Sequence, residues 1–486
     1  MIAYKRLRRL LFFGFIAAFG ITTAVVLFFA FGYRYSFERG IFVYSGSITL
    51  KTIPQEVVVT LDGEPVSAQS LGILNNSMHI TGLMPGEHQV EVSAPGYLPW
   101  KRHALVTSGR STEFWNILLT REEYVETELP ATEGTLRIFP GPETQLFALV
   151  KERGGTLSLV LLNRNTGVAS ELFTTTDATF DPLSTGVSWS PDGNWIFFPF
   201  TQENRSTSVL LNTNTRETLS LRTLHPDRSI DRIGFLPNSQ ARFFYLVDRD
   251  VYELDLSQET PTPLFKSSGI RTANFSGNFL YGVHESDGHI ERFRGSDAAP
   301  TPEHITPGVP DHLNIQAATL VVYDEDRLAF LERTGKRRLF VYNQSPDQEY
   351  GFREIGSNVS DIQFSDDGKK LLFFSRNEIN VYFFRPWEVQ PERAENSILQ
   401  IARFSDPIAS PVWSEDYEHI LFLHGNTVKV VELDHRDHRS LSDLVTFPHE
   451  PLSIMTAFDE NLLYFTFAEQ SVLSFVFPEP QGLFGQ

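Results

Sequence analysis

The stretch VSWSPDGNWIFFPF, residues Val187–Phe200, decides the fold of this chain. Two apolar runs flank the turn sequence from Ser190 to Gly193, which is typical of two antiparallel strands joined by a tight turn. The same pattern returns at Ile362–Phe374 and at Val412–Leu423. A unit that repeats in this way buries its faces only by stacking on its own copies. The sequence therefore predicts an array of β units.

One aromatic residue before each turn marks the period of this array. The markers are Phe139, Trp189, Phe235, Phe275, Tyr323, Phe364, Trp413 and Phe458, which lie 40 to 50 residues apart. Four-stranded propeller blades repeat every ~40–50 residues. Short β-branched and aromatic runs between Gly, Asp and Asn turns argue against helical repeats of similar period. We expect a mainly β chain with a propeller over residues 124–478, eight blades being favoured and seven possible.

The last unit predicts how the ring closes. After Phe458 only two apolar runs remain, at 462–467 and 471–477, and a short tail follows at 479–486. A four-stranded blade needs one more strand. We expect Tyr124–Leu129 to supply it as the outer strand of the eighth blade, because closure removes the open edges that otherwise invite aggregation.

The turn motifs also carry a family resemblance. Ser190-Pro191-Asp192-Gly193 and Ser365-Asp366-Asp367-Gly368 make the array similar to bacterial propellers of the TolB-like and WD-like kind. The resemblance implies the propeller fold and leaves the subfamily open.

The N-terminus predicts a membrane anchor. The run Leu10–Phe31 holds no charged residue and, at ~1.5 Å per residue, is long enough to cross a bilayer core of ~30 Å. The basic residues of the tail at 1–9 would keep it cytoplasmic under the positive-inside rule. They are Lys5, Arg6, Arg8 and Arg9. We expect a signal anchor at 10–32, with the lipid bilayer as its partner, single-pass insertion in the plasma membrane and the bulk of the chain extracytoplasmic. A cleaved signal peptide is the alternative, although such peptides have apolar regions of only ~7–15 residues.

Composition excludes several function classes. The net charge is −19, and residues 1–40 hold six basic side chains and one acidic one, so the rest of the chain carries a net charge of −24. An acidic body repels polyanions, so nucleic acid is excluded as a partner. The chain has no cysteine, which removes disulfides, thiolate metal sites and cysteine nucleophiles. No cofactor is predicted.

Residues 47–120 form a second unit of alternating strands and turns. A strand led by Pro54 ends in Asp62-Gly63, Leu83-Met84-Pro85-Gly86-Glu87-His88 follows, and Gly96-Tyr97 precedes Trp100. These motifs resemble the PEGA domain, a small β-sandwich of bacterial surface proteins, although the tetrapeptide that names the family reads Pro54-Gln55-Glu56-Val57 here. The resemblance implies a spacer or adhesive module. We expect Tyr97, Trp100 and Trp115 to pack its core.

No catalytic or metal-binding residues are predicted. Ser190–Gly193 fits a β-turn better than a sialidase-type motif. Asp434–His438 holds two imidazoles and two carboxylates but fits a solvated loop better than a metal site, and the acidic groups at 324–326 and 366–367 lack EF-hand spacing. G-x-S-x-G, H-E-x-x-H and Walker motifs are absent from the sequence.

Two long loops are the remaining candidates for binding, because binding residues concentrate on loops of a rigid scaffold. Gly295–Leu313 is rich in Pro, Ala, Thr and acids, and Phe384–Gln400 carries Arg385 and Trp387, our tentative binding residues. We expect a non-enzymatic platform that binds a protein, peptide or glycan outside the cytoplasm. An envelope-bound hydrolase acting on polysaccharide or peptide, and a purely structural role, are the alternatives.

Overall fold

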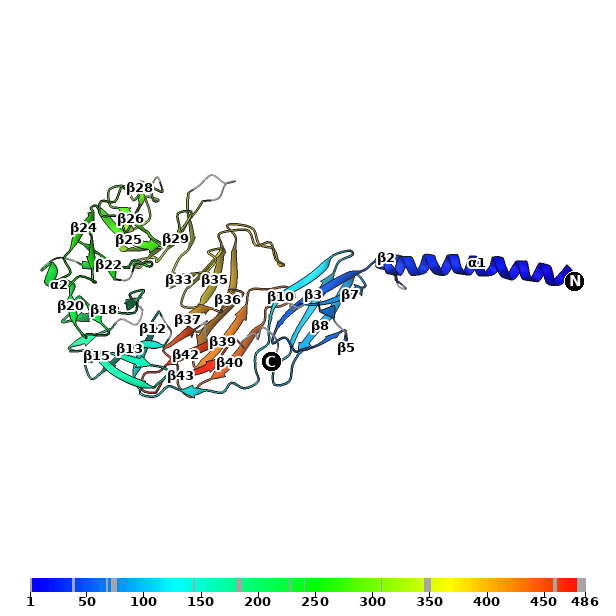
Figure 1. Ribbon diagram of the computed structural model, residues 1–486, viewed down its shortest axis with the longest axis horizontal. Helices are drawn as coiled ribbons and strands as arrows, with labels where there is room; N and C mark the ends of the chain where they lie inside the picture. The colour runs from blue at the N-terminus through cyan, green and yellow to red at the C-terminus, as the bar shows by residue number, and fades with distance from the viewer. Residues whose placement is uncertain are drawn as a thin grey trace.

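The computed structural model arranges three parts in line (Figure 1): a long N-terminal helix, a small β-sandwich and a large β-propeller. It describes residues 2–36, 40–66, 69–70, 77–142, 145–180, 186–226, 228, 230–239, 241–306, 308–344, 351–457 and 461–478. The marker Phe458 and the expected tail at 479–486 lie outside these residues.

Helix α1 (Ile2–Ala30) projects away from the rest of the protein (Figure 1). Within the described residues it is the one helix long and apolar enough to cross a membrane, over Arg8–Ala30, and none of that span is buried by the protein. A hairpin of β1 (Tyr33–Ser36) and β2 (Ile41–Tyr44) follows directly. Its exposed aromatic rings pack on one another and on the last turns of the helix.

The sandwich consists of two four-stranded sheets, ordered β10-β3-β7-β6 and β5-β4-β8-β9. The strands are β3 (Gly46–Ile53), β4 (Val58–Leu61), β5 (Glu64–Pro65), β6 (Gln69–Ser70), β7 (Ser77–Leu83), β8 (Gly86–Ser93), β9 (Trp100–Val106) and β10 (Ser111–Leu118). Alternate side chains of both sheets fill one core. Strands β9 and β10 are edge strands, and both edges face the propeller.

The first half of the propeller contains four blades, each an antiparallel sheet in chain order. Blade 1 is β12 (Thr135–Pro140), β13 (Leu146–Arg153), β14 (Thr156–Asn163) and β15 (Val168–Thr176). Blade 2 is β16 (Ala178–Thr179) with β17 (Ser188–Trp189), β18 (Trp195–Gln202), β19 (Arg205–Asn212) and β20 (Thr218–Ser220), followed by α2 (Leu221–Leu224). Blade 3 is β21 (Ile230–Phe235), β22 (Arg242–Val247), β23 (Asp250–Asp255) and β24 (Leu264–Ser267). Blade 4 is β25 (Ile270–Ser276), β26 (Phe279–His284), β27 (Ile290–Arg294) and β28 (Glu303–His304).

The second half contains four more blades. Blade 5 is β29 (Ala318–Asp324), preceded by the short helix η1 (Ile315–Ala317), then β30 (Arg327–Glu332), β31 (Leu339–Asn343) and β32 (Phe352–Gly356). Blade 6 is β33 (Asp361–Phe364), β34 (Lys370–Phe374), β35 (Glu378–Phe383) and β36 (Ile398–Arg403). Blade 7 is β37 (Ile408–Trp413), β38 (His419–His424), β39 (Thr427–Glu432) and β40 (Leu441–Thr446). Blade 8 is β41 (Ser453–Ala457), β42 (Leu462–Thr466), β43 (Leu473–Val476) and β11 (Thr127–Glu128). Eight blades confirm the favoured number.

Blade 8 closes the ring as the sequence predicts. Thr127 and Glu128 pair antiparallel with Ser474 and Leu473, so β11 is the outer strand of the last blade. On the other side of this blade, apolar side chains of blades 1 and 8 share one cluster. The expected strand Tyr124–Leu129 is therefore confirmed, although its regular part is only two residues long.

The marker residues hold neighbouring blades together. Six of the seven markers within the described residues lie on the first strand of a blade, and Trp189 lies on β17, which pairs with β18 as β16 does. The indole Nε1 of Trp189 donates to the carbonyl oxygen of Phe139 one blade earlier, at 3.2 Å, and that of Trp413 donates to the oxygen of Gln363 at 3.1 Å. An aromatic side chain with one polar atom thus fills the crowded inner part of the ring and satisfies a backbone acceptor there.

Candidate functional site

The turn motif belongs to the blade architecture. Ser190 accepts the N–H of Gly193 at 2.9 Å, which closes a β-turn, while its Oγ accepts the N–H of Trp195 at 2.9 Å. Ser365 makes the same two bonds in blade 6, with Gly368 and Lys370. Since the side chains of both serines are bonded within their own turns, the motif is a structural element that repeats with the blades.

Arg385 is bonded within the propeller. Its guanidinium donates to the carbonyl oxygens of Phe384 at 2.8 Å and Gln344 at 2.9 Å, and to Oδ1 of Asn343 at 2.5 Å. The carboxylate of Glu395 lies 3.7 Å away. These contacts tie the loop between β35 and β36 to the end of blade 5.

Trp387 covers a buried ion pair. The ammonium of Lys370 lies 4.2 Å from the centre of the indole ring, within range of a cation–π contact, and pairs with the carboxylate of Glu418. Burial raises the pKa of Glu418, and the nearby Lys370 opposes this shift. The structure thus places both tentative binding residues in contacts with their own chain.

Gln390, farther along the same loop, caps an edge strand of the sandwich. Its Oε1 accepts the N–H of Glu113 at 3.1 Å, and its Nε2 donates to the oxygen of Ser111 at 3.0 Å. One side-chain amide therefore bonds to edge strand β10 as a neighbouring strand would. On edge strand β9 the N–H of His103 donates to Oδ2 of Asp437 at 2.9 Å. The propeller thus bonds to one edge strand of each sheet, β9 and β10.

A buried ion pair joins the two domains at the same place. The guanidinium of Arg102, on β9, pairs with the carboxylate of Glu432, on β39, and the exposed fractions of the two side chains are 0% and 7%. Glu432 also accepts the N–H of Ser440 at 2.8 Å. Burial lowers the pKa of Arg102, while the charges of Asp434 and Asp437 oppose this shift. We call the contacts of β9 and β10 with Gln390, Glu432 and residues 434–437 the docking interface.

The loop Asp434–His438, which we expect from the sequence to be solvated, belongs to this interface. The guanidinium of Arg436 donates to the oxygen of Glu113 at 2.7 Å, pairs with Asp434 at 2.6 Å, and lies 4.2 Å from the ring centre of Phe114. The loop is solvated in part, since His435, Asp437 and His438 are exposed, while Arg436 and Asp437 also serve docking. The guanidinium of Arg439, the next residue, donates to the oxygen of Gln400 at 2.9 Å.

Two acidic side chains of blades 5 and 6 are likewise bonded to side chains of their own chain. Asp324 pairs with Arg327, whose guanidinium lies 4.3 Å from the ring centre of Tyr323. Asp367 accepts the hydroxyl of Ser365 at 2.7 Å. Both carboxylates therefore have partners within their own or the adjacent turn.

A surface cavity of about 440 Å³ lies between blades 2 and 3. Three arginines line it together with hydroxyl side chains and one carboxylate; the lining residues are Arg205, Ser206, Thr207, Ser208, Arg222, Arg228, Ile230 and Asp231. Guanidinium groups present paired N–H donors that match carboxylate, phosphate and sulfate groups. The cavity is thus suited to an acidic ligand on a protein whose net charge is −19.

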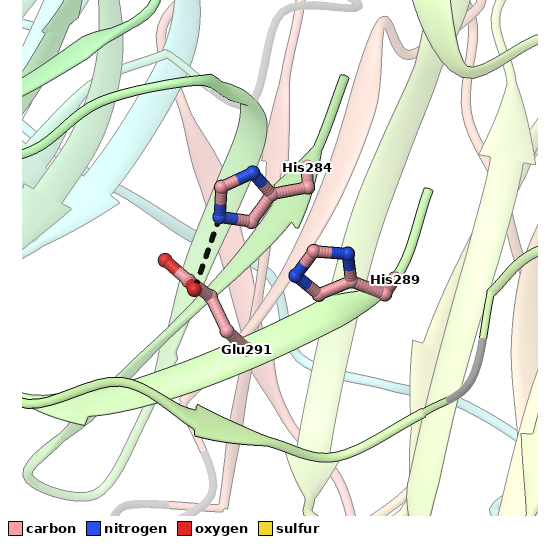
Figure 2. A group of neighbouring side chains, drawn as sticks. All are labelled: His284, His289 and Glu291. Atoms are coloured by element: carbon pink, nitrogen blue, oxygen red, sulfur yellow. Dashed lines mark ion pairs between the residues drawn. The ribbon is translucent and has the colours of Figure 1, made fainter. Parts of the chain in front are cut away.

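Blade 4 carries a second cluster, of His284, His289 and Glu291 (Figure 2). Their ligand atoms all lie within 4.8 Å of one another, and Nε2 of His284 is 3.0 Å from Oε2 of Glu291. The two imidazole rings stack with their centres 4.3 Å apart. Within the described residues this is the one group of three or more histidines and carboxylates with the spacing of a metal site.

The sandwich geometry agrees with a comparison against protein families. Residues 45–122 match the PEGA domain. The PEGA match includes both sheets of the sandwich and the docking strands β9 and β10, and it spans less than half of the chain. No curated protein matches the sequence.

Two solved structures that resemble this chain are described as propellers. The Dos1 propeller is 12% identical, with 74% of this chain and 96% of that chain covered and a TM-score of 0.49. The β-propeller domain of Myceliophteria thermophila Cps50 (Swd1) is 12% identical, with 71% and 98% covered and a TM-score of 0.41.

Two of the three aromatic residues that we expected in the core of the PEGA-like domain do pack there. Trp100 lies in the core and Tyr97 packs against it. Trp115 instead lines a small cavity at the docking interface, and its indole Nε1 donates to Glu113 at 2.8 Å. Strand alternation explains the difference, because Trp115 follows the buried Phe114 and so points to the opposite face.

Neither the arginine cavity nor the histidine cluster was predicted from the sequence. Arg205, Arg222 and Arg228 come from different elements and form no motif. The cluster does leave a signal: His284 and His289 flank a four-residue turn that contains Asp287-Gly288, and Glu291 follows two residues later. In a hairpin this spacing places all three side chains on one face.

Proposed function

We propose that the protein is an exported, membrane-anchored interaction platform, whose propeller binds a protein, peptide or glycan that carries acidic groups. The arginine-lined cavity between blades 2 and 3 supports this proposal most directly. It offers three guanidinium groups and three hydroxyl side chains within about 440 Å³, and one of these guanidinium groups, that of Arg228, also pairs with Asp248 at 3.3 Å. Groups of this kind recognise carboxylate, phosphate or sulfate through charge-assisted hydrogen bonds.

The other two parts would set the position of the propeller. In this proposal α1 crosses the plasma membrane with Lys5, Arg6, Arg8 and Arg9 on the cytoplasmic side, and the aromatic hairpin after it lies at the outer interface. The PEGA-like domain acts as a spacer. Because it is docked on blades 6 and 7, the cavity between blades 2 and 3 lies in another part of the ring and stays available.

A binding measurement on the full chain in detergent micelles tests the proposal. The probes are a polyglutamate peptide and a sulfated glycan, each fluorescently labelled, at about 150 mM salt, where non-specific charge effects are screened. We expect at least one probe to bind, and the double substitution of Arg205→Gln with Arg222→Gln to weaken binding at least tenfold. Arg153→Gln, an exposed arginine at the end of β13 in blade 1, is the matched control and should leave binding unchanged.

Two results would contradict the proposal. Equal weakening by the control and the cavity variants would mean that the probes sense only overall charge. Turnover of a glycoside or peptide probe would favour the hydrolase instead. The topology is tested separately, since protease added to intact cells should cut the chain beyond residue 32.

A further inference from the structure

The hairpin of blade 4 places four chemically related side chains on one face. The N–H of His284 donates to the oxygen of His289 at 2.9 Å, so these residues face each other at the ends of β26 and β27. Glu291 lies two residues beyond His289, and His304 on β28 is its direct cross-strand partner. Because side chains alternate between faces, all four project to the same side. Figure 2 shows the two imidazoles and the carboxylate pointing toward one another.

Glu291 differs from the other buried glutamates of the propeller. Glu253 pairs with Lys266 at 2.5 Å, Glu332 with Arg338 at 2.7 Å, and Glu432 with Arg102. Glu291 is equally buried, at 3% exposure, but among the described residues it pairs with an imidazole, that of His284, and accepts the hydroxyl of Ser267 at 3.4 Å. A buried carboxylate needs a compensating positive charge. A bound cation would supply this positive charge beside Glu291.

The neighbours of the cluster are arranged as they are around metal-binding histidines. Oδ1 of Asp287 lies 2.5 Å from Nδ1 of His289, which leaves Nε2 of that ring facing Glu291. A carboxylate on the second ring nitrogen is the usual device that orients a histidine ligand. The ring of His304 stacks on the outer side of His289 with centres 4.5 Å apart and limits its rotation. Gly269 approaches Nδ1 of His284 so closely that a side chain there would press on the ring.

We propose that Nε2 of His284, Nε2 of His289 and the carboxylate of Glu291 bind one divalent transition-metal ion of the Zn²⁺ class. Two imidazoles with one carboxylate form a donor set that Zn²⁺ uses and that Ca²⁺ and Mg²⁺, which take oxygen ligands, do not. Ligand atoms of a tetrahedral Zn²⁺ ion lie ~3.3 Å apart, given bonds of ~2.0–2.1 Å. The side chains reach that spacing by small rotations from their present separation. Glu291 and Asp287 together balance the charge of the ion.

The proposed metal site lies apart from the arginine cavity. It lies at the hairpin end of blade 4, joins β26 to β27, and is separate from the arginine cavity, with which it shares no lining residue. Three protein ligands leave a fourth position for water or for a group from a binding partner. The ion would fix the hairpin and offer a point of coordination on the surface of the ring.

The test is zinc binding by the full chain in detergent micelles. Metal-free protein is dialysed against Zn²⁺ held at a fixed free concentration by a chelator, and bound metal is measured by atomic emission. We expect the wild type to hold one Zn²⁺ more per chain than either His289→Gln or Glu291→Gln. Asp287→Ala, which removes only the orienting carboxylate, should weaken binding about tenfold. His449→Gln, an exposed histidine in the loop before β41, should match the wild type.

A second readout separates a lost ligand from a damaged fold. Co²⁺ bound to imidazole nitrogen absorbs visible light, and this absorption should appear in the wild type and in His449→Gln and be absent in His289→Gln. Far-UV circular dichroism identifies any variant that fails to fold, and Glu291→Gln is the conservative variant for that case. If folded Glu291→Gln takes up as much Zn²⁺ as the wild type, Glu291 serves only as the ion-pair partner of His284, and the proposal is wrong.

Discussion

Removing one partner of the Arg102–Glu432 pair should release the PEGA-like domain from the propeller. Both side chains are almost fully buried, at 0% and 7% exposure, and they belong to different domains. Breaking a buried ion pair on one side leaves an uncompensated charge and costs ~3–5 kcal/mol. We therefore expect Arg102→Met alone, or Glu432→Leu alone, to weaken docking by about that amount.

Hydrogen exchange measures this directly, because two backbone N–H groups are bonded across the interface. The N–H of His103 donates to Asp437, and that of Glu113 donates to Gln390. A loss of ~3–5 kcal/mol corresponds to exchange that is ~10² to several 10³ times faster, at 1.36 kcal/mol per factor of ten. The N–H of Gln89 donates to a carboxylate within the PEGA-like domain and is the internal control.

The double variant distinguishes a true pair from two independent effects. Exchanging both partners for apolar residues of similar volume is often neutral, so the combination of Arg102→Met and Glu432→Leu should exchange nearly as slowly as the wild type. If the effects of the two substitutions simply add, or if either single variant leaves the interface amides protected, the pair does not hold the domains together. Faster exchange at the internal control would indicate a disturbed domain and not undocking.

Three further outcomes follow from the propeller and its interface. Gly368→Ala should destabilise the chain by ~2–4 kcal/mol in thermal unfolding, because a methyl group at this positive φ also collides with the ring of Tyr323. Gly193→Ala, in the equivalent turn of blade 2, makes only an ordinary contact with Cδ of Pro142 at 3.8 Å and should cost only ~1 kcal/mol; equal losses would contradict this. Trp413→Phe should cost ~1–3 kcal/mol, because it removes the donor to a partly buried carbonyl and shortens a fully buried side chain. An unchanged melting temperature would count against an interblade role. Hydrogen bonds from His103 of the sandwich lower the pKa of Asp437 from 3.8 to about 2. The contribution of Asp437 to docking is therefore full above about pH 4 and is lost as the pH falls toward 2. The difference in interface hydrogen exchange between wild type and Asp437→Asn should vanish over that range, and a difference that stays constant would refute this role of Asp437.

The sequence predicts the propeller because its signals are local. A marker aromatic, a Ser-x-Asp-Gly turn and the following apolar run lie within about 14 residues, and each fixes one hairpin whatever the rest of the chain does. The closing strand was predictable for a related reason: blade 8 lacks a strand, and Thr127–Glu128 lies just before the first blade. The PEGA-like sandwich follows from alternation and turn residues in the same way.

The docking interface was not predictable, because Arg102 and Glu432 are more than 300 residues apart and neither belongs to a motif. Arg385 and Trp387 were expected to face a ligand, since a long loop on a rigid ring usually does. The fold instead uses that loop to cover Lys370 and to cap the sandwich through Gln390. Such contacts depend on how distant parts of the chain pack together, which no local sequence pattern records.

Strand β11 sits between the tether and the ring, and this determines how mechanical load would travel. In the proposed anchored state, tension between the bilayer and a ligand bound to the propeller would have one covalent route, through residues 119–126 into β11, which is paired with β43 over only two residues. That strand would be peeled first, and the ring would open there. The ion pair and capped edges of the docking interface form a parallel, stronger connection that carries the load past β11, so that the closure strand is spared as long as the two domains stay joined.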